Sequence, residues 1–380
     1  MFFMERIVYL DHAATTPVDE HVLNKMLPYF HLSYGNPSSM YTIGRRNKRA
    51  IEQARNDVAE VIGASPKEIF FTSCGTESDN LALKGIAYAN REKGNHIITS
   101  KIEHPAILNV CYTLEKQGYE VTYVGVDEQG IVRLEELQQA IKPTTILISI
   151  MMANNEIGSI QPIQEIGRIA DKHHIYFHTD AVQAMGNVKV NVQELHVDLL
   201  SMSAHKFYGP KGMGAIYIKQ GTKIDRIMDG GHQEKRKRSG TENVAGIVGL
   251  AEALRLANQH MAANNKKVLA LRNYFIEKLK EISRGLRING DLEKRLPGNV
   301  NVTFPELDAQ NLLFELDEKG ICASAGSACS TGDATPSHVL TAIGLTTREV
   351  EGTLRFSLGK GNTKEEIDYV VETLKNEYHP

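Results

Sequence analysis

The chain has 380 residues, which is more than one hydrophobic core usually serves, so we expect two domains. Its 43 Lys and Arg residues nearly balance 46 Asp and Glu residues, and the resulting net charge of −3 argues against a dedicated nucleic-acid binder or a protein drawn to anionic lipid. The longest apolar run, Ile146–Ala153, is far too short to span a membrane. Because the first ten residues lack the apolar region of a signal peptide, we expect a cytoplasmic protein.

Hydrophobic periodicity predicts helices and strands in regular alternation through the first half of the chain. An amphipathic helix is expected at Arg45–Ile62. The expected strands are Glu68–Thr72, His96–Thr99, Glu120–Val126, Thr145–Met152 and Tyr176–Thr179, and the helices between them are Ser78–Lys93, Pro105–Gln117, Leu134–Ile141 and Ile163–His173. This alternation predicts an α/β fold with a mostly parallel sheet covered by helices on both faces.

The pattern changes in the second half. An Ala- and Leu-rich helical region runs from Asn243 to Ile282, and shorter elements follow Gly285. Strands are expected at 286–289, 299–304 and 352–357, and helices at 310–319, 337–343 and 364–378. We therefore expect a large domain at residues 16–260 and a smaller α/β domain formed by residues 1–15 and 261–380.

Lys206 and Asp180 carry the strongest chemical signal. Lys206 follows the strand-like stretch Asp198–Ser201 and is flanked by Ser203 and His205, and a lysine held there can lose its proton and form a Schiff base with an aldehyde cofactor. Asp180 ends the strand 26 residues earlier, where a carboxylate can pair with the pyridinium nitrogen of pyridoxal phosphate. Each residue alone would more often be an ordinary surface lysine or turn aspartate.

A phosphate site is suggested by the stretch from Thr72 to Asn80, which joins a strand to a helix and offers Gly75 and Thr76. Alone, this stretch would more often be a capping turn; with Ser203 and His205 it forms a credible phosphate cup. His104 stands before Pro105 at another strand-to-helix junction, where it either covers a planar ring or simply begins the helix.

Four cysteines are too few for a disulfide framework, and no pair has the spacing of a zinc site, so we expect no metal. Cys329 lies among small and hydroxylated residues, in a loop where a thiol is accessible as a nucleophile. Cys111 and Cys322 lie in apolar stretches and are expected in the core. Cys74, inside the expected phosphate loop, is ambiguous.

Motifs along nearly the whole chain resemble those of the cysteine desulfurases of the NifS/IscS type, which are pyridoxal-phosphate enzymes of fold type I in the class-V aminotransferase family. The matching stretches are Tyr9–Pro17, Gly35–Ser39, Thr72–Asn80, Glu103–His104, Asn154–Glu156, His178–Gln183, Ser203–Gly212, Arg238–Asn243, Gly326–Cys329 and Leu354–Gly359. The resemblance implies a large domain with a seven-stranded, mostly parallel sheet and a smaller C-terminal domain that carries the cysteine loop.

The resemblance also implies a role for each matching residue. Lys206 would bind the cofactor covalently, His104 would stack on its ring, Asp180 would hold the ring nitrogen and Gln183 the phenolic oxygen. Gly75, Thr76, Ser203 and His205 would bind the phosphate, together with Thr241 from the second subunit of a homodimer. Arg355 would grip the carboxylate of L-cysteine, Asn155 and Asn36 would position the substrate, and Cys329 would take its sulfur as a persulfide.

Several alternatives stay open from the sequence. A selenocysteine lyase would remove the β-substituent without a catalytic thiol, and an inactive scaffold would only bind sulfur-transfer partners. The sulfur acceptor is either an iron–sulfur scaffold or an enzyme of tRNA or cofactor thiolation. The basic run Lys235–Arg238 either docks such a partner or is a solvated loop. Cys74 stands where this family usually has a small residue, which puts the cofactor affinity of that loop in question.

Overall fold

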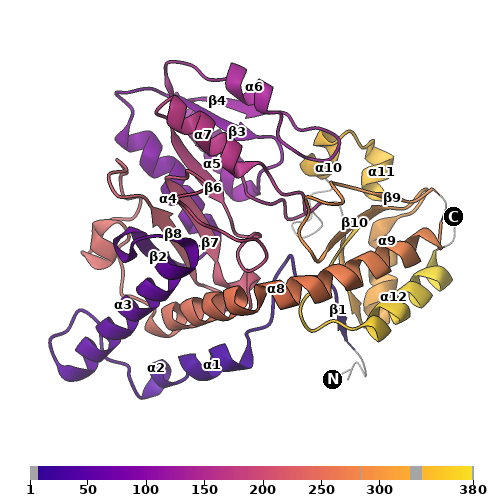
Figure 1. Ribbon diagram of the computed structural model, residues 1–380, viewed down its shortest axis with the longest axis horizontal. Helices are drawn as coiled ribbons and strands as arrows, with labels where there is room; N and C mark the ends of the chain where they lie inside the picture. Colours follow the sequence, from indigo (N-terminus) through magenta and orange to yellow (C-terminus); the bar gives the residue numbers. More distant parts are fainter. Residues whose placement is uncertain (1–6, 284, 326–335, 379–380) are drawn as a thin grey trace.

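The long helix α8 (Val244–Lys280) joins two parts of the molecule, each built around its own sheet, in the computed structural model (Figure 1). The structure describes residues 7–283, 285–325 and 336–378. Within them, the other helices are α1 (Glu20–Met26), α2 (Pro28–His31), α3 (Thr42–Ile62), α4 (Gly75–Ala89), α5 (Pro105–Lys116), α6 (Leu134–Gln139), α7 (Ile163–Lys172), α9 (Ala309–Glu318), α10 (His338–Ala342), α11 (Thr347–Glu351) and α12 (Lys364–Glu377). No helix in these ranges is long and apolar enough to cross a membrane.

The larger sheet has seven strands in the order β2-β8-β7-β6-β5-β3-β4. Its members are β2 (Ile69–Thr72), β3 (His96–Ser100), β4 (Glu120–Val124), β5 (Thr145–Ser149), β6 (Tyr176–Asp180), β7 (Leu199–Ser203) and β8 (Gly214–Ile218). All neighbours are parallel except β8, which is antiparallel to both β2 and β7. The prediction of an α/β fold with a mostly parallel sheet is confirmed, and every expected element from residue 45 to 180 is found within a few residues of its expected ends.

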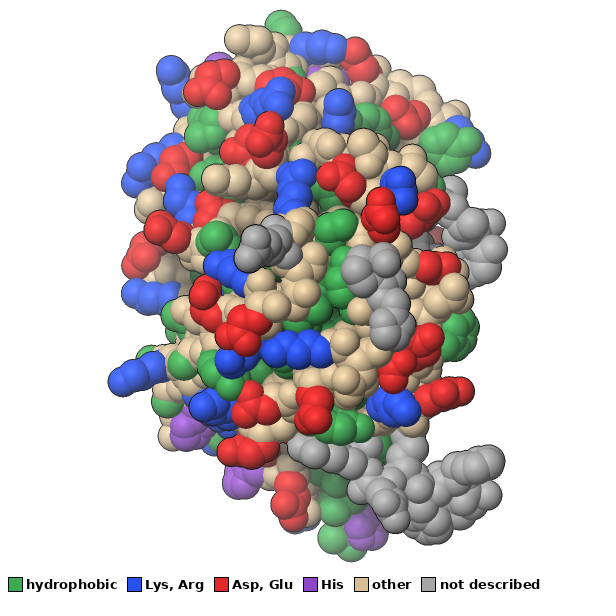
Figure 2. Space-filling model, turned by 90° about the vertical axis from the view of Figure 1, so that its right-hand side faces the viewer, with side chains coloured by type: hydrophobic (Ala, Val, Ile, Leu, Met, Phe, Trp, Pro, Cys, Tyr) green, Lys and Arg blue, Asp and Glu red, His purple; other side chains and the backbone are tan. Residues whose placement is uncertain are grey.

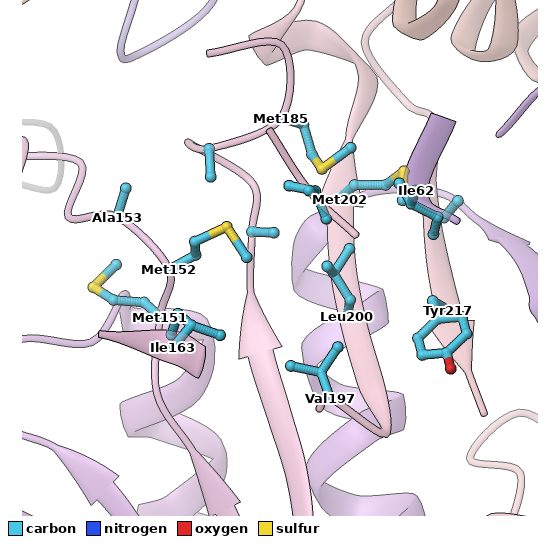
Figure 3. Close-up of a cluster of buried hydrophobic side chains, with 14 of the residues drawn as sticks. Ile62, Met151, Met152, Ala153, Ile163, Met185, Val197, Leu200, Met202 and Tyr217 are labelled. Atoms are coloured by element: carbon cyan, nitrogen blue, oxygen red, sulfur yellow. The ribbon is translucent and has the colours of Figure 1, made fainter. Parts of the chain in front are cut away.

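The main core lies against this sheet and includes residues such as Met185, Leu200, Met202 and Tyr217, shown in Figure 3. The first turns of α8 belong to it through Leu250 and Leu254. Each large apolar side chain that is fully buried in this core stabilises the folded state by about 1.5–3 kcal/mol. The core therefore gives the strand ends a rigid base.

A second core belongs to the C-terminal part and to the start of the chain. Its four-stranded antiparallel sheet has the order β12-β13-β10-β9, with β9 (Arg287–Ile288), β10 (Asn299–Thr303), β12 (Ser324–Ala325) and β13 (Thr353–Ser357). Strand β1 (Val8–Tyr9) pairs in parallel with β11 (Ile321–Cys322). Val8 and Leu10 pack in this core with residues from the far end of α8, including Phe275 and Leu279. The chain thus passes from the second core into the first just after residue 10.

Charged side chains of both signs are interspersed over the described part of the face shown in Figure 2. This mixture agrees with the balanced composition of the chain. It gives that face no single dominant sign of charge.

Candidate active site

A cavity of about 300 Å³ opens where the neighbouring parallel strands β6 and β7 end. The carboxyl ends of parallel strands are where α/β folds bind their ligands. Most of the residues singled out in the sequence line this cavity, namely Gly75, Thr76, His104, Asn155, Asp180, Gln183, Ser203, His205, Lys206 and Arg355. The fold therefore gathers them into one site.

Three of the expected residues are not placed in the cavity. Asn36 is exposed and does not line it; its Oδ1 accepts a hydrogen bond from the backbone N–H of Ser38 at 2.9 Å. Thr241 is also exposed and outside the cavity of its own chain, as a residue offered to a second subunit would be. Cys329 lies outside the described residues.

Lys206 ends the short turn η2 (Ala204–Lys206), which directly follows β7. Its Nζ donates hydrogen bonds to the carbonyl oxygens of Ala13 and Ala14 at 2.5 and 2.7 Å. Burial, with a smaller contribution from the positive charge of Arg355, lowers the pKa of Lys206 to about 8. A substantial fraction of the amine is therefore neutral near neutral pH, as a nucleophilic or basic lysine requires.

Asp180 is the last residue of β6 and is almost fully buried. Its Oδ1 accepts the backbone N–H of Val182 at 2.8 Å. Burial raises the pKa of this carboxyl, while the charges of His104 and Lys206 act in the opposite direction. A cationic group in the cavity would favour the ionised carboxylate in the same way.

Asp79 and His178 lie close to Asp180, and the sequence analysis gave neither a role. His178 is bonded on both ring nitrogens, to the hydroxyls of Ser149 and Ser201 at 2.9 Å each, and burial lowers its pKa to about 3. Asp79, on α4, lines the cavity with an Oδ1 that accepts no hydrogen bond and lies 3.6 Å from His178 Nε2. Burial and the neighbouring Asp180 raise the pKa of Asp79. The only sequence signal that could have pointed to a role for Asp79 was its position inside the Thr72–Asn80 motif.

The first turn of α4 borders the cavity. The helix begins at Gly75, where an added Cβ would lie 2.7 Å from Val182 Cγ2, so only glycine leaves room there. Ser203 and His205 border the same space, and burial together with the charges of Lys206 and Lys211 lowers the pKa of His205 to about 4. Neutral His205, a hydroxyl and the N–H groups of the first turn are a donor set that suits a phosphate.

His104 begins a helix, as one of the two readings of the sequence has it, and it also faces the cavity. It is the N-cap of α5, where its Nδ1 accepts the backbone N–H of Ala106 at 3.1 Å, and it also lines the cavity. Burial lowers the pKa of His104, and the charge of Lys206 lowers it further against the opposing effect of Asp180. The bond at Nδ1 fixes the ring orientation and leaves Nε2 for a proton.

The segment from Asp11 to Thr16 crosses the cavity and was not given a role from the sequence beyond its match to the family motif. The carbonyls of Ala13 and Ala14 hold Lys206, and that of Ala13 also accepts from Gln183 Nε2 at 2.9 Å. Thr15 Oγ1 bonds His205 Nδ1 at 3.1 Å, and Asp11 pairs with Arg355 at 2.8 Å. The segment thus connects the residues expected at the ring, the phosphate and the substrate.

The three described cysteines differ in environment. Cys111 is buried, as expected, and burial raises its pKa to about 12. The expectation that Cys322 is a core residue is wrong: it is partly exposed, because its two-residue strand pairs only with the equally short β1. Cys74 lines the cavity as the N-cap of α4, and its side chain makes no capping hydrogen bond. No group of three metal-ligating side chains is found among the described residues.

A larger cavity of about 390 Å³ lies on the other side of Lys206 and shares Ala13, Asn155, Gln183 and Lys206 with the first. It does not include Asp180, His104 or the start of α4. Of these two cavities, only the smaller one therefore brings Lys206 together with Asp180 and His104.

Comparison with known proteins gives consistent similarities. Residues 8–370 match the family described as aminotransferase class-V. The chain is 54% identical over 369 residues to "Cysteine desulfurase IscS" of Methanosarcina thermophila, covering 97% of this chain and 91% of that protein. It is 52% identical over 373 residues to the protein of the same name from Clostridium botulinum, covering 98% and 94% of the two chains. A solved structure titled "NIFS-LIKE PROTEIN" superposes with a TM-score of 0.93 at 41% identity, covering 98% of this chain and 99% of that chain.

Proposed function

This chain belongs to the class-V aminotransferase family and is a cysteine desulfurase that depends on pyridoxal phosphate, and from that premise we propose which of its residues carry the reaction. The observation that carries the proposal is the convergence of Lys206 and Asp180 from adjacent strand ends into one cavity, with the pKa of Lys206 lowered to about 8.

The residues of the smaller cavity fit the cofactor. The backbone N–H groups of the first turn of α4, together with Ser203 and His205, suit the phosphate. Asp180 suits a cationic ring nitrogen, Gln183 the phenolic oxygen, and His104 and Asn155 border the same space. When bound, pyridoxal phosphate stores the electron pair released when the substrate loses its Cα proton.

The protein's own groups handle the substrate and its protons. The guanidinium of Arg355 binds the carboxylate of L-cysteine, with Asn155 beside it. Lys206 Nζ is the base that takes the Cα proton, and His104 Nε2 is the group placed to move a proton at the substrate thiol. Cys329, which lies outside the described residues, is the nucleophile that takes the sulfur and leaves alanine. The expected role of Asn36 in positioning the substrate finds no support in the cavity of this chain, because Asn36 is exposed and does not line it.

We propose a homodimer in which Thr241 completes the phosphate site of the partner. Its support is an apolar surface on α1, α2 and the following loop, which we call the α1–α2 surface. Its exposed large side chains are Leu23, Leu27, Phe30, Leu32, Tyr34, Met40 and Tyr41. Exposed apolar groups gathered over one segment are typical of a protein interface. The division into domains at 16–260 and at 1–15 with 261–380 also stays a proposal, supported by the two separate cores.

The sulfur acceptor, we propose, is a protein partner in iron–sulfur assembly or in tRNA or cofactor thiolation. The support is that all three processes use the same persulfide donor. The cytoplasmic location, and the expectation of no direct nucleic-acid or membrane partner, remain predictions from the sequence.

Substitution of Lys206 tests the assignment. Lys206→Ala should lower the rate of alanine formation by about 100- to 10,000-fold, because it removes the proton-transfer group. Borohydride reduction followed by gel filtration leaves only covalently attached cofactor on the protein. The absorbance of that attached cofactor should be absent from Lys206→Ala. Lys172→Ala, at an exposed lysine of α7, is the control and should behave as wild type. Full activity of Lys206→Ala would overturn the assignment.

A further inference from the structure

Arg355 is already engaged on most of its donors. From β13, its Nη2 donates to Asp11 Oδ1 at 2.8 Å and to Ser324 Oγ at 3.1 Å, while Nη1 donates to the carbonyl oxygen of Asn155 at 3.2 Å. Its Nε is buried and has no hydrogen-bond partner. These three hydrogen bonds use both N–H groups of Nη2 and one of Nη1, and they leave the N–H of Nε and the second N–H of Nη1.

Asp11 is held firmly in this position. Its second oxygen, Oδ2, accepts a hydrogen bond from Ser324 Oγ at 3.0 Å, and its carbonyl oxygen accepts from the hydroxyl of Tyr9 at 3.0 Å. A bridge between Asp11 and Ser357 fixes its backbone against the end of β13. The Asp11 and Arg355 side chains are only 15% and 12% exposed, so water screens their interaction much less than that of a surface pair.

A substrate carboxylate cannot accept two hydrogen bonds from Arg355 without displacing one of the groups that the guanidinium already binds. Every adjacent pair of guanidinium donors includes at least one Nη group, and both Nη groups are engaged. The incoming carboxylate must therefore bind through a donor that these partners leave over, or displace one of them, and in either case it shares the cation with the carboxylate of Asp11. Two anions around one guanidinium repel each other, and in a shielded site the repulsion is considerable.

We propose that Asp11 is a positioning residue that holds Arg355 in the cavity and, as a resident counter-anion, limits how tightly the carboxylates of the substrate and of the product alanine are bound. The proposal rests on the proposed role of Arg355. Its consequence is that alanine leaves readily, because the guanidinium is never without a second anion. Ser324 supports the arrangement, since its hydroxyl bonds both members of the pair.

The test is the affinity of the holoenzyme for two carboxylates, measured by isothermal titration calorimetry. One is L-alanine, and the other is 3-mercaptopropionate, which resembles cysteine without its amino group. Asp11→Asn removes the charge but keeps the shape and an oxygen for Arg355, and it should tighten both dissociation constants by about tenfold. In turnover, the same variant should lower KM and kcat together, because alanine is held longer.

Four further variants make the test decisive. Asp11→Ser, a second charge-removing variant, should also tighten binding, whereas Asp11→Glu keeps the charge and should not. Asp229→Asn breaks an exposed aspartate–arginine pair, with Arg226 at 2.9 Å, and should change nothing. Unchanged or weaker carboxylate binding in a folded Asp11→Asn or Asp11→Ser protein would overturn the proposal. If Arg355→Gln leaves carboxylate binding at the wild-type value, it is the proposed role of Arg355 that fails instead.

Discussion

Glu103 is a buried carboxyl beside the site whose ionisation opposes folding. It is fully buried next to His104 and accepts hydrogen bonds from Ser100 Oγ at 2.6 Å and from the backbone N–H of Met151 at 3.0 Å. Burial outweighs these bonds and raises its pKa from 4.5 to about 8. The folded protein therefore keeps the proton of Glu103 over a pH range in which the unfolded chain has lost it.

The pH dependence of stability follows from this shift. Between pH 4.5 and about 8 the folded state binds more protons than the unfolded state at Glu103, so its contribution to the free energy of unfolding falls as pH rises. Glu103→Gln cannot ionise and removes this dependence. The stability of the wild type relative to Glu103→Gln should therefore fall by about 4 kcal/mol between pH 5 and pH 8.

Urea unfolding at the two pH values measures that difference. Glu92→Gln, at an exposed position, is the matched control and should show no such trend. An equal difference between wild type and Glu103→Gln at pH 5 and pH 8 would contradict the assignment of a raised pKa to Glu103.

Some residues of the site could be identified from the sequence, and others could not. Lys206 and Asp180 could be identified because a strand precedes each one and their chemistry is specific. Asp11 could not, because its partner Arg355 is 344 positions away and only the pairing of the chain's start with its last strand brings them together. Asp79 was missed because one turn of helix separates it from the phosphate loop, and only the fold shows that it faces His178.

The loop before α8 is a strained element held by a buried ion pair. Three consecutive residues other than glycine, Glu234, Lys235 and Arg236, have positive φ values of 42°, 53° and 69°. Such conformations cost about 1–3 kcal/mol each and persist only where the surroundings enforce them. Glu234 is paired with Arg55 of α3 through two hydrogen bonds of 2.8 Å and also accepts the N–H of Phe71.

The basic run in this loop is largely engaged within the chain. Lys235 Nζ bonds the carbonyl of Lys67 at 3.2 Å, Lys237 Nζ that of Ile224 at 2.9 Å, and Arg238 pairs with Glu77 of α4 at 2.9 Å. These contacts tie the loop, and Thr241 with it, to the start of α4. They give the run a structural role in addition to any contact with a partner.

Breaking the pair at one end should destabilise the protein strongly. Glu234→Gln removes the buried counter-charge of Arg55, leaves only the half-exposed Glu52 at 3.5 Å, and should cost about 3–5 kcal/mol in the free energy of unfolding. The exposed Glu281 pairs with Lys278 at a similar distance of 2.8 Å, and Glu281→Gln should have no measurable effect in the same denaturation assay. If the two variants proved equally stable, the loop would not depend on the Arg55–Glu234 pair.

Element by element, the hydrophobic pattern predicted the parallel strands well, because they are buried on both faces and read as continuous apolar runs. It missed β8, whose apolar residues directly follow a run rich in glycine. The short helices α1 and α2 also escaped, since several of their apolar residues face outward instead of a core. A pattern that assumes a buried apolar face therefore does not identify these two helices.

At the scale of the whole molecule, two cores meet along α8, and the cavity lies near their junction. Ala13 and Ala14 near the start of the chain, the ends of β6 and β7, and Arg355 of β13 all line it. The change in pattern near residue 243 is the sequence signal behind the proposed division into two domains. The crossing of the first residues into the second core depends on the pairing of β1 with β11, and no local pattern shows it.

The proposed dimer gives a prediction at this scale. Charges on the α1–α2 surface should prevent association, because an unpaired charge would be buried in the interface. Phe30 and Met40 are 62% and 88% exposed, and a Phe30→Asp/Met40→Asp variant should sediment as a monomer and lose phosphate-site affinity for the cofactor. Phe314 of α9 is 73% exposed on another surface, and Phe314→Asp should leave the mass in solution unchanged. Wild-type protein that sediments as a monomer would contradict the dimer.

The account is tested most directly by mass spectrometry of the holoenzyme after a single exposure to L-cysteine, with alkylation and peptide mapping of all four cysteines. We predict one added sulfur on the peptide that contains Cys329, and one alanine released for each sulfur added. Cys329→Ser should form no such adduct. Release of alanine with no sulfur on Cys329, or with the sulfur on Cys74, Cys111 or Cys322, would contradict the assignment of Cys329 as the sulfur acceptor of this site.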